Sequence, residues 1–510
     1  MTTMKTLITS QNSLLTILRS RSASILVALT LGAFALAPVP TAFGVVPAPD
    51  GGYPGGNTAE GDNALFNLTT GTGNTAIGSN ALLHNTIGRN NTAEGDVALE
   101  NNTTGIDNTA IGVFALTNNT IGNSNTAIGF FALFSNTTGN NNTANGVEAL
   151  INNSTGSNNT ANGFAALLSN TTGDDNTATG FQALDSNTTG SLNTANGVNA
   201  LFNNITGGNN TANGVAALFN NTTGGNNTAN GVDALASNGS GGNNTANGFN
   251  ALFSNTLGNF NTADGLNAIG HNSTGNRNTA DGVNALFGNT TGNNNTASGE
   301  AALFRNTTGS SNIAMGVNAG SNLTIGNNNI HIGNVGVAGE ANTIRVGMQG
   351  TQTRTFIAGI SGVAVAGSAV VANANGQLGI AASSERFKDE IKPMDKASEA
   401  ILALQPVTFH YKKEIDPTRT LQFGLVAEDV EKVNPALVMR DKEGKPYSVR
   451  YDQVNAMLLN EFLKEHRKVQ ALEASAAQQQ KQIEALTAGL QKVSAQLEAR
   501  KPAPQVVKNP

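Results

Sequence analysis

Apolar and polar positions along residues 57–328 follow a pattern that repeats every seventeen residues without an insertion. Each of the sixteen units begins with Asn, usually as Asn-Thr-Ala, and has Gly at its fifth and fifteenth positions and Ala at its eighth. The ninth position is Leu in all units except two. A short, strict period of this kind predicts a solenoid, in which similar units stack on one another. A typical unit reads Asn142-Thr-Ala-Asn-Gly-Val-Glu-Ala-Leu-Ile-Asn-Asn-Ser-Thr-Gly-Ser-Asn158.

The unit is too short and too rich in glycine for a pair of helices, because Gly costs about 1 kcal/mol per helix position relative to Ala. Asn and Thr favour turns and strands. We therefore predict two short strands per unit, one around Thr-Ala-x-Gly and one around Ala-Leu-Phe. Stacking would bury columns of Ala and Leu and would line up the first Asn of each unit as a ladder of amides. The predicted fold class is mainly β, with a β-roll or β-solenoid stalk of sixteen coils over residues 57–328.

Two further columns are too large for a thin core. The sixth position is mostly Val or Phe, as at Val147 and Phe164, and the tenth is often Phe, as at Phe202. A single roll would expose these side chains as a long apolar stripe, and such stripes mark association surfaces. We therefore expect the chain to associate with copies of itself.

The second position is Thr from Thr58 to Thr296, and this column suggests an alternative function. If the following Ala points inward, strand alternation turns the Thr outward. The rows would then form a flat face that suits ice or a polysaccharide. The Asn and Gly neighbours explain the Thr equally well as packing, so both interpretations stay open.

Asn-x-Thr triplets such as Asn136-Thr-Thr138 have the form of glycosylation acceptors. We favour a structural role for these asparagines, in ladders and corners.

The charge pattern excludes several kinds of partner. The net charge is −6, and twenty of the twenty-eight Lys and Arg residues lie at or beyond Arg386. No basic stripe with interleaved aromatic residues is present, so we expect no nucleic-acid partner. The aspartates at 62, 96, 107 and 174 share no single repeat position, and no His, Asp or Glu cluster recurs. We therefore expect no metal, no cofactor and no activity on other substrates.

Residues 1–44 resemble an export signal, because basic residues precede an apolar run from Ile25 to Ala37 and small residues follow near Ala42. The alternative is an uncleaved membrane anchor, but the run is short for a span of about 20 residues. The chain contains no cysteine, so no disulfide can stabilise it. We expect a protein that is secreted or lies on a bacterial cell surface.

Three units contain Asn-Thr-Ala-Ile-Gly, at 74–78, 108–112 and 125–129. In this they resemble the head repeats of trimeric bacterial surface adhesins, which stack short coils into left-handed parallel β-rolls, three chains together. The resemblance implies a homotrimer, and a surface glycan or a host cell is the external partner that it implies. Those adhesins end in a membrane-anchoring segment with a terminal aromatic residue. This chain ends on Val507-Lys508-Asn509-Pro510, which leaves its anchoring open.

Beyond a β neck predicted over residues 329–382, the composition changes at Ser383 to a charged, globular pattern. The segments Ser383-Ser-Glu-Arg-Phe-Lys388, Phe423-Gly-Leu-Val-Ala-Glu-Asp-Val430 and Val449-Arg-Tyr451 resemble the peptidase S74 family. Its members are intramolecular chaperone domains at the ends of phage tailspikes and other trimeric fibres. The likeness predicts such a domain over residues 383–468.

The S74 resemblance also implies a single-turnover serine autopeptidase. It makes Ser383 the nucleophile, Lys388 the base and Ala382–Ser383 the scissile bond. The chemistry is consistent, because a lysine whose amine is neutral can activate a serine hydroxyl. Ser384 and Phe387 depart from the Asp and Leu that are usual in the family, which leaves the cleavage rate open.

Four other motif residues, Gly424, Ala427, Pro435 and Tyr451, are interpreted as packing and turn residues.

The last predicted element is a coiled coil over residues 455–500. Apolar residues there follow one 3-4 heptad register, interrupted only by Glu465 and Gln479. The heptads leave the number of strands open, and three is what the two resemblances imply. The apolar positions are Leu458, Phe462, Val469, Leu472, Ala476, Ile483, Leu486, Leu490, Val493 and Leu497.

These parts predict an exported trimeric fibre or adhesin-like stalk whose C-terminal S74 domain directs assembly. Near-identical repeats specify register weakly, since a slip by one coil restores almost every contact. Long-range β assembly is also slow and exposes sticky intermediates. A module that aligns the chain ends would remove this ambiguity.

Overall fold

The computed structural model describes residues 53–358, 360, 366–373, 375–441 and 443–500. The chain divides into two compact units, one through Gln352 and one from Thr353 onward. The export signal expected over residues 1–44 lies outside the described residues and stays a prediction. Within the described ranges, no helix combines the length and the apolarity needed to cross a membrane.

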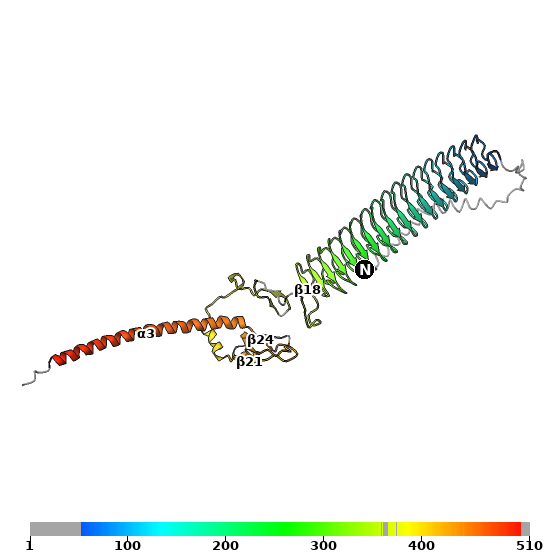
Figure 1. Ribbon diagram of the computed structural model, residues 1–510. Coiled ribbons are helices and arrows are strands. Elements are labelled where there is room, and N and C mark those ends of the chain that lie inside the picture. Colours follow the sequence, from blue (N-terminus) through cyan, green and yellow to red (C-terminus); the bar gives the residue numbers. More distant parts are fainter. Residues whose placement is uncertain (1–52, 359, 361–365, 374, 442, 501–510) are drawn as a thin grey trace, which may run out of the picture. The chain divides into compact units, whose positions relative to one another are not determined.

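The first unit is a β-solenoid with one parallel strand per coil, all in a single eighteen-stranded sheet (Figure 1). Each strand pairs with the next in identical register, so that Thr143 lies opposite Thr160 and Ala144 opposite Ala161. The predicted mainly-β solenoid is thereby confirmed. The strands are β1 Thr58–Glu60, β2 Thr75–Ile77, β3 Thr92–Glu94, β4 Thr109–Ile111, β5 Thr126–Ile128, β6 Thr143–Asn145, β7 Thr160–Asn162, β8 Thr177–Thr179, β9 Thr194–Asn196, β10 Thr211–Asn213, β11 Thr228–Asn230, β12 Thr245–Asn247, β13 Thr262–Asp264, β14 Thr279–Asp281, β15 Thr296–Ser298, β16 Ile313–Met315, β17 Ile330–Ile332 and β18 Ile344–Val346.

The second strand expected in each coil, around Ala-Leu-Phe, is a run of turns instead. The reason is that the seventh and ninth positions adopt left-handed backbone, as at Glu148 (φ 60°) and Leu150 (φ 54°). A residue with positive φ cannot continue an extended strand. Leu150 is nevertheless fully buried, so the packing of the Leu column offsets a local cost of about 1–2 kcal/mol per residue.

The core consists of the predicted columns. Ala144, Ala149 and Leu150 have no exposed surface, and their copies in neighbouring coils are equally buried. In the same coil Thr143 and Asn145, on either side of the inward Ala144, are exposed. The sheet therefore presents its Thr column outward, as strand alternation requires.

The first Asn of each coil forms the predicted ladder inside the solenoid. The Asn142 side-chain amide donates to Oδ1 of Asn125 at 3.1 Å and to the Gly156 carbonyl oxygen of its own coil at 2.8 Å. The Asn142 backbone N–H donates to the same Asn125 Oδ1 at 3.0 Å. These asparagines are fully buried, so each ladder bond links two coils where water cannot compete for it.

A second ladder, which the sequence analysis missed, runs through the twelfth position. The Asn153 amide donates to Oδ1 of Asn136 at 2.9 Å and to the Gly156 carbonyl at 2.9 Å. Gly156 O therefore accepts from both ladders. The signal was available, because this position is Asn in every coil from Asn85 to Asn306. The buried amide of Asn136 also supports the structural interpretation of the Asn-x-Thr triplets.

The two glycine columns are required for different reasons. Gly146 has φ 139°, and a Cβ there would lie 2.4 Å from the Gly163 carbonyl oxygen of the next coil. At Gly156 φ is unexceptional, but a Cβ would lie 2.5 Å from Oδ1 of Asn153. The fifth position thus needs both the conformation and the small size of Gly, while the fifteenth makes room for the ladders.

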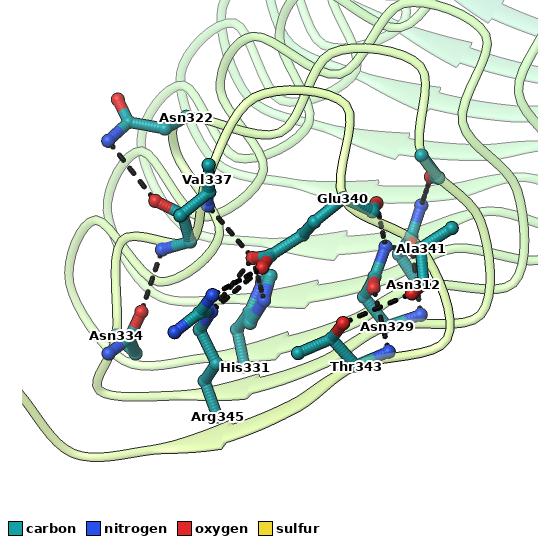
Figure 2. Close-up of polar contacts among 12 residues, drawn as sticks. Asn312, Asn322, Asn329, His331, Asn334, Val337, Glu340, Ala341, Thr343 and Arg345 are labelled. Atoms are coloured by element: carbon teal, nitrogen blue, oxygen red, sulfur yellow. Dashed lines mark hydrogen bonds and ion pairs between the residues drawn. The ribbon is translucent and has the colours of Figure 1, made fainter. Parts of the chain in front are cut away.

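The solenoid continues past residue 328, where the strict sequence period ends. Residues 329–346, assigned on sequence to the β neck, carry β17 and β18, which pair in register at a shorter spacing (Ile330 opposite Ile344). In this last coil His331 takes the place of the inward Ala (Figure 2). In the preceding coil, Gly320 occupies the ninth position, where other coils have Leu. A Cβ on Gly320 would lie 3.2 Å from Nδ1 of His331. The missing Leu therefore makes room for the imidazole.

A charge cluster around the buried His331 closes this end, which we call the cap (residues 320–346, Figure 2). His331 Nε2 lies 3.0 Å from Oε1 of Glu340, and the Arg345 guanidinium donates to the Glu340 carboxylate at 2.7–3.0 Å. Burial lowers the pKa of His331, and the nearby Glu340 only partly opposes this. Burial alone would raise the pKa of Glu340, but hydrogen bonds from Arg345 and the Val337 N–H outweigh it, and the net shift is downward.

The two ladders end differently at the cap. In the first ladder, Oδ1 of Asn329 accepts the Thr343 N–H at 3.1 Å. In the second, Leu323 follows Asn306, and the buried Oδ1 of Asn306 has no hydrogen-bond partner. The second ladder therefore stops at an unsatisfied acceptor.

The second unit is small and mixed. Its hairpins pair β19 (Val371–Ala372) with β20 (Leu378–Gly379), β21 (Val407–Phe409) with β22 (Gln422–Gly424), and β23 (Val438–Arg440) with β24 (Pro446–Val449). Its core is formed by Val430, Leu437, Val438, Val449 and Met457. The helical elements are the 3-10 helices η1 (Glu385–Phe387), η2 (Asp395–Ala403) and η3 (Pro435–Leu437), and the α-helices α2 (Ala427–Val433) and α3 (Tyr451–Ala499).

Replacement of Asn170 by Ala should destabilise the solenoid strongly. Asn170 accepts from Asn187 at 2.8 Å and donates to Asn153 at 2.8 Å. Loss of its side chain leaves buried amide atoms unpaired, and we expect the free energy of unfolding to fall by about 2–5 kcal/mol. Asn162→Ala in the same coil is the matched control, because Asn162 is exposed. Equal denaturation midpoints for the two variants would contradict the role of the ladder.

The cap should loosen in acid before the rest of the solenoid. Both His331 and Glu340 have a lowered pKa in the folded chain, so each favours the folded cap above its unfolded pKa and this stability is lost as pH falls. The loss begins below about pH 6.5 for His331 and below about 4.3 for Glu340. Hydrogen exchange should show the β17 and β18 amides losing protection at about pH 5.5 while those of β8 keep it.

The control for this pH effect is the double variant Gly320→Leu/His331→Ala, which restores the residues of the repeat. In this variant the cap should no longer lose stability between about pH 6.5 and 5. It should still lose stability at lower pH, where Glu340 becomes protonated. If the β17 amides of the parent chain stayed as protected as those of β8 throughout, the cap would not be acid-sensitive.

Candidate functional site

The two residues predicted to form a catalytic pair lie next to each other at the start of the charged segment. Ser384 N-caps the short helix η1, and Lys388 follows its last residue. The Lys388 backbone N–H donates to the Glu385 carbonyl at 2.9 Å. This tight turn brings Nζ of Lys388 to 3.3 Å from Oγ of Ser383, as a donor to the hydroxyl. The five-residue spacing therefore places an amine beside the serine.

The surroundings of this pair are open in the single chain. Ala382, Ser383 and Lys388 are all exposed. The adjacent Phe387 is 63% exposed and carries the Arg386 guanidinium 4.7 Å from its ring centroid. A lysine must be desolvated to act as a neutral base. The contact between amine and hydroxyl is thus present, whereas the burial that would activate the amine is not supplied by this chain alone.

The motif residues interpreted as packing residues do have structural contacts. The Tyr451 hydroxyl accepts the Leu425 N–H at 2.9 Å, and a Cβ on Gly424 would lie 2.8 Å from that hydroxyl. Gly424 is therefore small because Tyr451 lies against it. Pro435 occupies the first turn of η3, and Ala427 is the first residue of α2 and packs on the small core.

A polar cluster that the sequence analysis missed joins η2 to α3; we call it the clamp (Ser398, Asn460, Glu461 and Lys464). Ser398 is fully buried and donates to the Glu461 carboxylate. The Asn460 amide donates to the Ser398 oxygen at 2.7 Å, and Lys464 donates to Glu461 at 2.6 Å. The hydrogen bond from Lys464, followed by that from Ser398, lowers the pKa of Glu461. Residues more than sixty apart in sequence meet here, so no local motif could have revealed the clamp.

The clamp lies off the heptad stripe of α3. The apolar stripe of α3 starts with Leu458 and Phe462. None of the α3 residues of the clamp, Asn460, Glu461 and Lys464, occupies a position of this stripe. The chain's own η2 therefore covers one side of the helix start. The apolar side remains open, with Leu472 61% and Leu490 70% exposed.

An apolar groove continues this open side into the small domain. It is bordered by residues of η2, β21, β22 and the first turns of α3, and Leu458 belongs to both the groove and the heptad stripe. Phe423 at its edge is 77% exposed. The groove lining comprises Ile401, Leu404, Pro406, Val407, Thr408, Phe423, Gly424, Leu425, Tyr451, Val454 and Leu458.

No metal centre accompanies these features in the described part of the chain, where no three His, Cys, Asp or Glu side chains are grouped so that they could hold an ion.

Comparison with known proteins adds one match. No curated protein matches the chain. The family model of peptidase S74, described as the chaperone of endosialidase, matches residues 383–439. The match begins at Ser383 and spans the Ser383–Lys388 pair, η2, α2 and η3, while the solenoid and the whole of α3 lie outside it. Residues 383–439 therefore match the peptidase S74 family, as two of the three sequence motifs predicted, while the third, Val449-Arg-Tyr451, lies beyond the match.

Proposed function

We propose that this chain is an exported homotrimeric fibre in which the C-terminal unit gathers three copies and aligns them before the solenoids stack. The observation that carries the proposal is the uncovered apolar stripe of α3, on a helix of 49 residues attached to the S74 segment. An isolated helix with a continuous apolar stripe gains most of its stability from packing against a partner. Heptad spacing makes other copies of α3 the matching partners.

The solenoid explains why alignment would be needed. Neighbouring strands pair Thr on Thr and Ala on Ala through coil after coil, as between β6 and β7 and between β9 and β10. A shift of one chain by one coil therefore changes few contacts, and register is weakly specified. In a C-terminal coiled coil, a shift by one heptad would place the polar interruptions Glu465 and Gln479 against apolar residues such as Leu472, which disfavours the shifted register.

Exposed apolar columns support lateral association of the stalks. The sixth position is apolar in eleven successive coils from Val113 to Val283, and each of these side chains is at least 36% exposed. Phe164 and Phe181 stack along the column, with ring centroids 5.3 Å apart. Asp96 and Glu300 occupy the same position just beyond either end of the stripe. Contiguous apolar surface of this kind is typical of an interaction face.

Autocleavage is the second part of the proposal. Ser383 Oγ attacks the Ala382 carbonyl carbon, the Ala382–Ser383 C–N bond breaks, and an ester to the serine oxygen forms. Lys388 takes the hydroxyl proton and returns it to the leaving amine, and water then hydrolyses the ester. Trimer formation would bury Phe387 and Lys388 together, which supplies the desolvation that the single chain lacks. Cleavage would then release the assembly domain and leave a kinetically stable fibre.

A ligand-binding solenoid is the second candidate, and one observation favours it. The outward Thr of β1–β15 make no side-chain hydrogen bond within the described residues, whereas the Thr of the thirteenth position do, as Thr171 Oγ1 donates to the Thr188 carbonyl at 3.0 Å. A rigid row of free hydroxyls suits ice or a polysaccharide. Thermal-hysteresis and glycan-array assays on the full chain distinguish this candidate from a passive stalk.

Substitution of Ser383 by Ala should abolish cleavage. The intact mass of the purified parent should include a fragment that begins at Ser383, and this fragment should be absent from the variant. Lys388→Arg should also block cleavage, because a guanidinium keeps its proton. Ser384→Ala is the neighbouring control and should still be cut. Cleavage of the Ser383→Ala chain between residues 382 and 383 would refute the assigned nucleophile.

Single cysteines can test the α3 seam, because the chain has none of its own. On mild oxidation Leu472→Cys should give disulfide-linked chains, since the apolar stripe positions of neighbouring helices face each other. Ala474→Cys, two residues away and off the stripe, should stay unlinked. Light scattering should give three times the chain mass for the Ser383→Ala background. A monomer at micromolar concentration would contradict the assembly proposal.

A further inference from the structure

Six coils carry Asn at the fourth position followed by the invariant Gly. In an Asn-Gly step the Gly backbone nitrogen can attack the Asn side-chain carbon Cγ, because no Cβ hinders its approach. The new N–Cγ bond forms a cyclic imide, the Cγ–Nδ2 bond breaks and ammonia leaves. Water then opens the ring to Asp or to isoaspartate. The six steps begin at Asn145, Asn162, Asn196, Asn213, Asn230 and Asn247.

We propose that these six steps are deamidation sites that coil stacking switches off, so that the modification marks chains that have not folded into the solenoid. The inference uses the solenoid alone and does not depend on the proposed assembly function.

The attacking nitrogen is held by the neighbouring coil. Gly163 N–H donates to the Asn145 carbonyl oxygen at 2.9 Å, and Gly214 N–H donates to that of Asn196 at 2.9 Å. The other four glycines make the same bond, at 2.8–2.9 Å. To reach Cγ the nitrogen must leave this bond and the peptide must rotate out of a sheet that has partners on both sides. Reaction therefore requires local opening of the stack.

In some of the six steps the Asn side chain that would be attacked is also fixed by a hydrogen bond to the next coil. Asn213 donates to Asn230 at 2.8 Å, and Asn230 donates to Asn247 at 2.9 Å. These bonds run along the outer face, perpendicular to the strands, and keep the amides turned toward the adjacent coil. Asn196 is exposed and makes no such side-chain bond within the described residues. Among the six, Asn196 should be the first to react when the stack opens.

Modification would oppose stacking once it had occurred. Asp264 and Asp281 already occupy this column and lie opposite each other on β13 and β14. Conversion of Asn247 would place a third carboxylate beside them, and like charges on paired strands repel. Isoaspartate would also lengthen the backbone inside a three-residue strand and shift the register. A chain modified before folding would thus be a poor partner for its own neighbouring coils.

The test is peptide mapping by mass spectrometry of the full chain after incubation at mildly alkaline pH, native and in guanidinium chloride. Asn375-Gly376 provides the internal reference, because it is exposed in the second unit and its Gly N–H makes only a local turn bond, to the Asn373 carbonyl at 3.0 Å. In the native chain the six sites should convert at least about tenfold more slowly than Asn375. In denaturant all seven should convert at similar rates.

Asn-Thr steps in the same peptides, such as Asn170-Thr171, control for specificity and should stay amidated in both conditions. Conversion of the six solenoid sites in the native chain as fast as Asn375 would overturn the proposal. So would the absence of conversion in denaturant. In the Asn170→Ala chain, whose ladder is broken in the coil of Asn162, conversion should rise at Asn162 before Asn247. A rise at Asn247 first would also count against control by local stacking.

Discussion

The structure depends on hydrogen bonds between buried amides of successive coils. A core that consists of two Ala columns and one Leu column is thin, and it buries little apolar area per residue. The two Asn ladders compensate because each amide satisfies its neighbour where water is absent, and both ladders meet on the carbonyl of the fifteenth-position Gly. The arrangement tolerates no side chain at that glycine. The seventeen-residue period is strict because an insertion would misalign both ladders at once.

Because every coil must stack on the next in the same way, the repeat itself predicts much of the solenoid. Strict recurrence of Asn, Ala and Gly indicated stacked coils, inward Ala, outward Thr and one amide ladder. The strand expected around Ala-Leu was wrong, because Leu150 and its copies adopt left-handed backbone, a conformation that propensities disfavour and that only the stacked environment enforces. The second ladder was visible as a column of Asn at the twelfth position, but the sequence analysis did not identify that column as a ladder of its own. Gly320 is one of the two exceptions to the Leu column, yet only the structure shows that it makes room for His331.

In the C-terminal unit, the family motifs located the Ser383–Lys388 pair and the structure brings its side chains together. Motifs could not locate the clamp, since Ser398 and Glu461 are joined by tertiary packing alone. The clamp matters for orientation. By holding one side of α3 against η2, it leaves the apolar stripe and the groove at Leu458 on the open side. The polar contact within the chain thus determines which apolar surface of α3 stays exposed.

Whether an asparagine of this protein can be chemically modified depends on its surroundings in the fold. Asn136 has the sequence of a glycosylation acceptor, yet its amide is buried in a ladder and inaccessible. Asn213 has the sequence of a labile Asn-Gly step, yet its backbone and side chain are tied to adjacent coils. In an unfolded chain both asparagines would expose their reactive groups. If the proposed protection holds, an asparagine-rich solenoid is chemically durable only while it is stacked, and slow or misregistered folding carries a chemical penalty in addition to the risk of aggregation. Any device that shortens the time before the coils stack would protect the covalent structure of the chain as well as its shape.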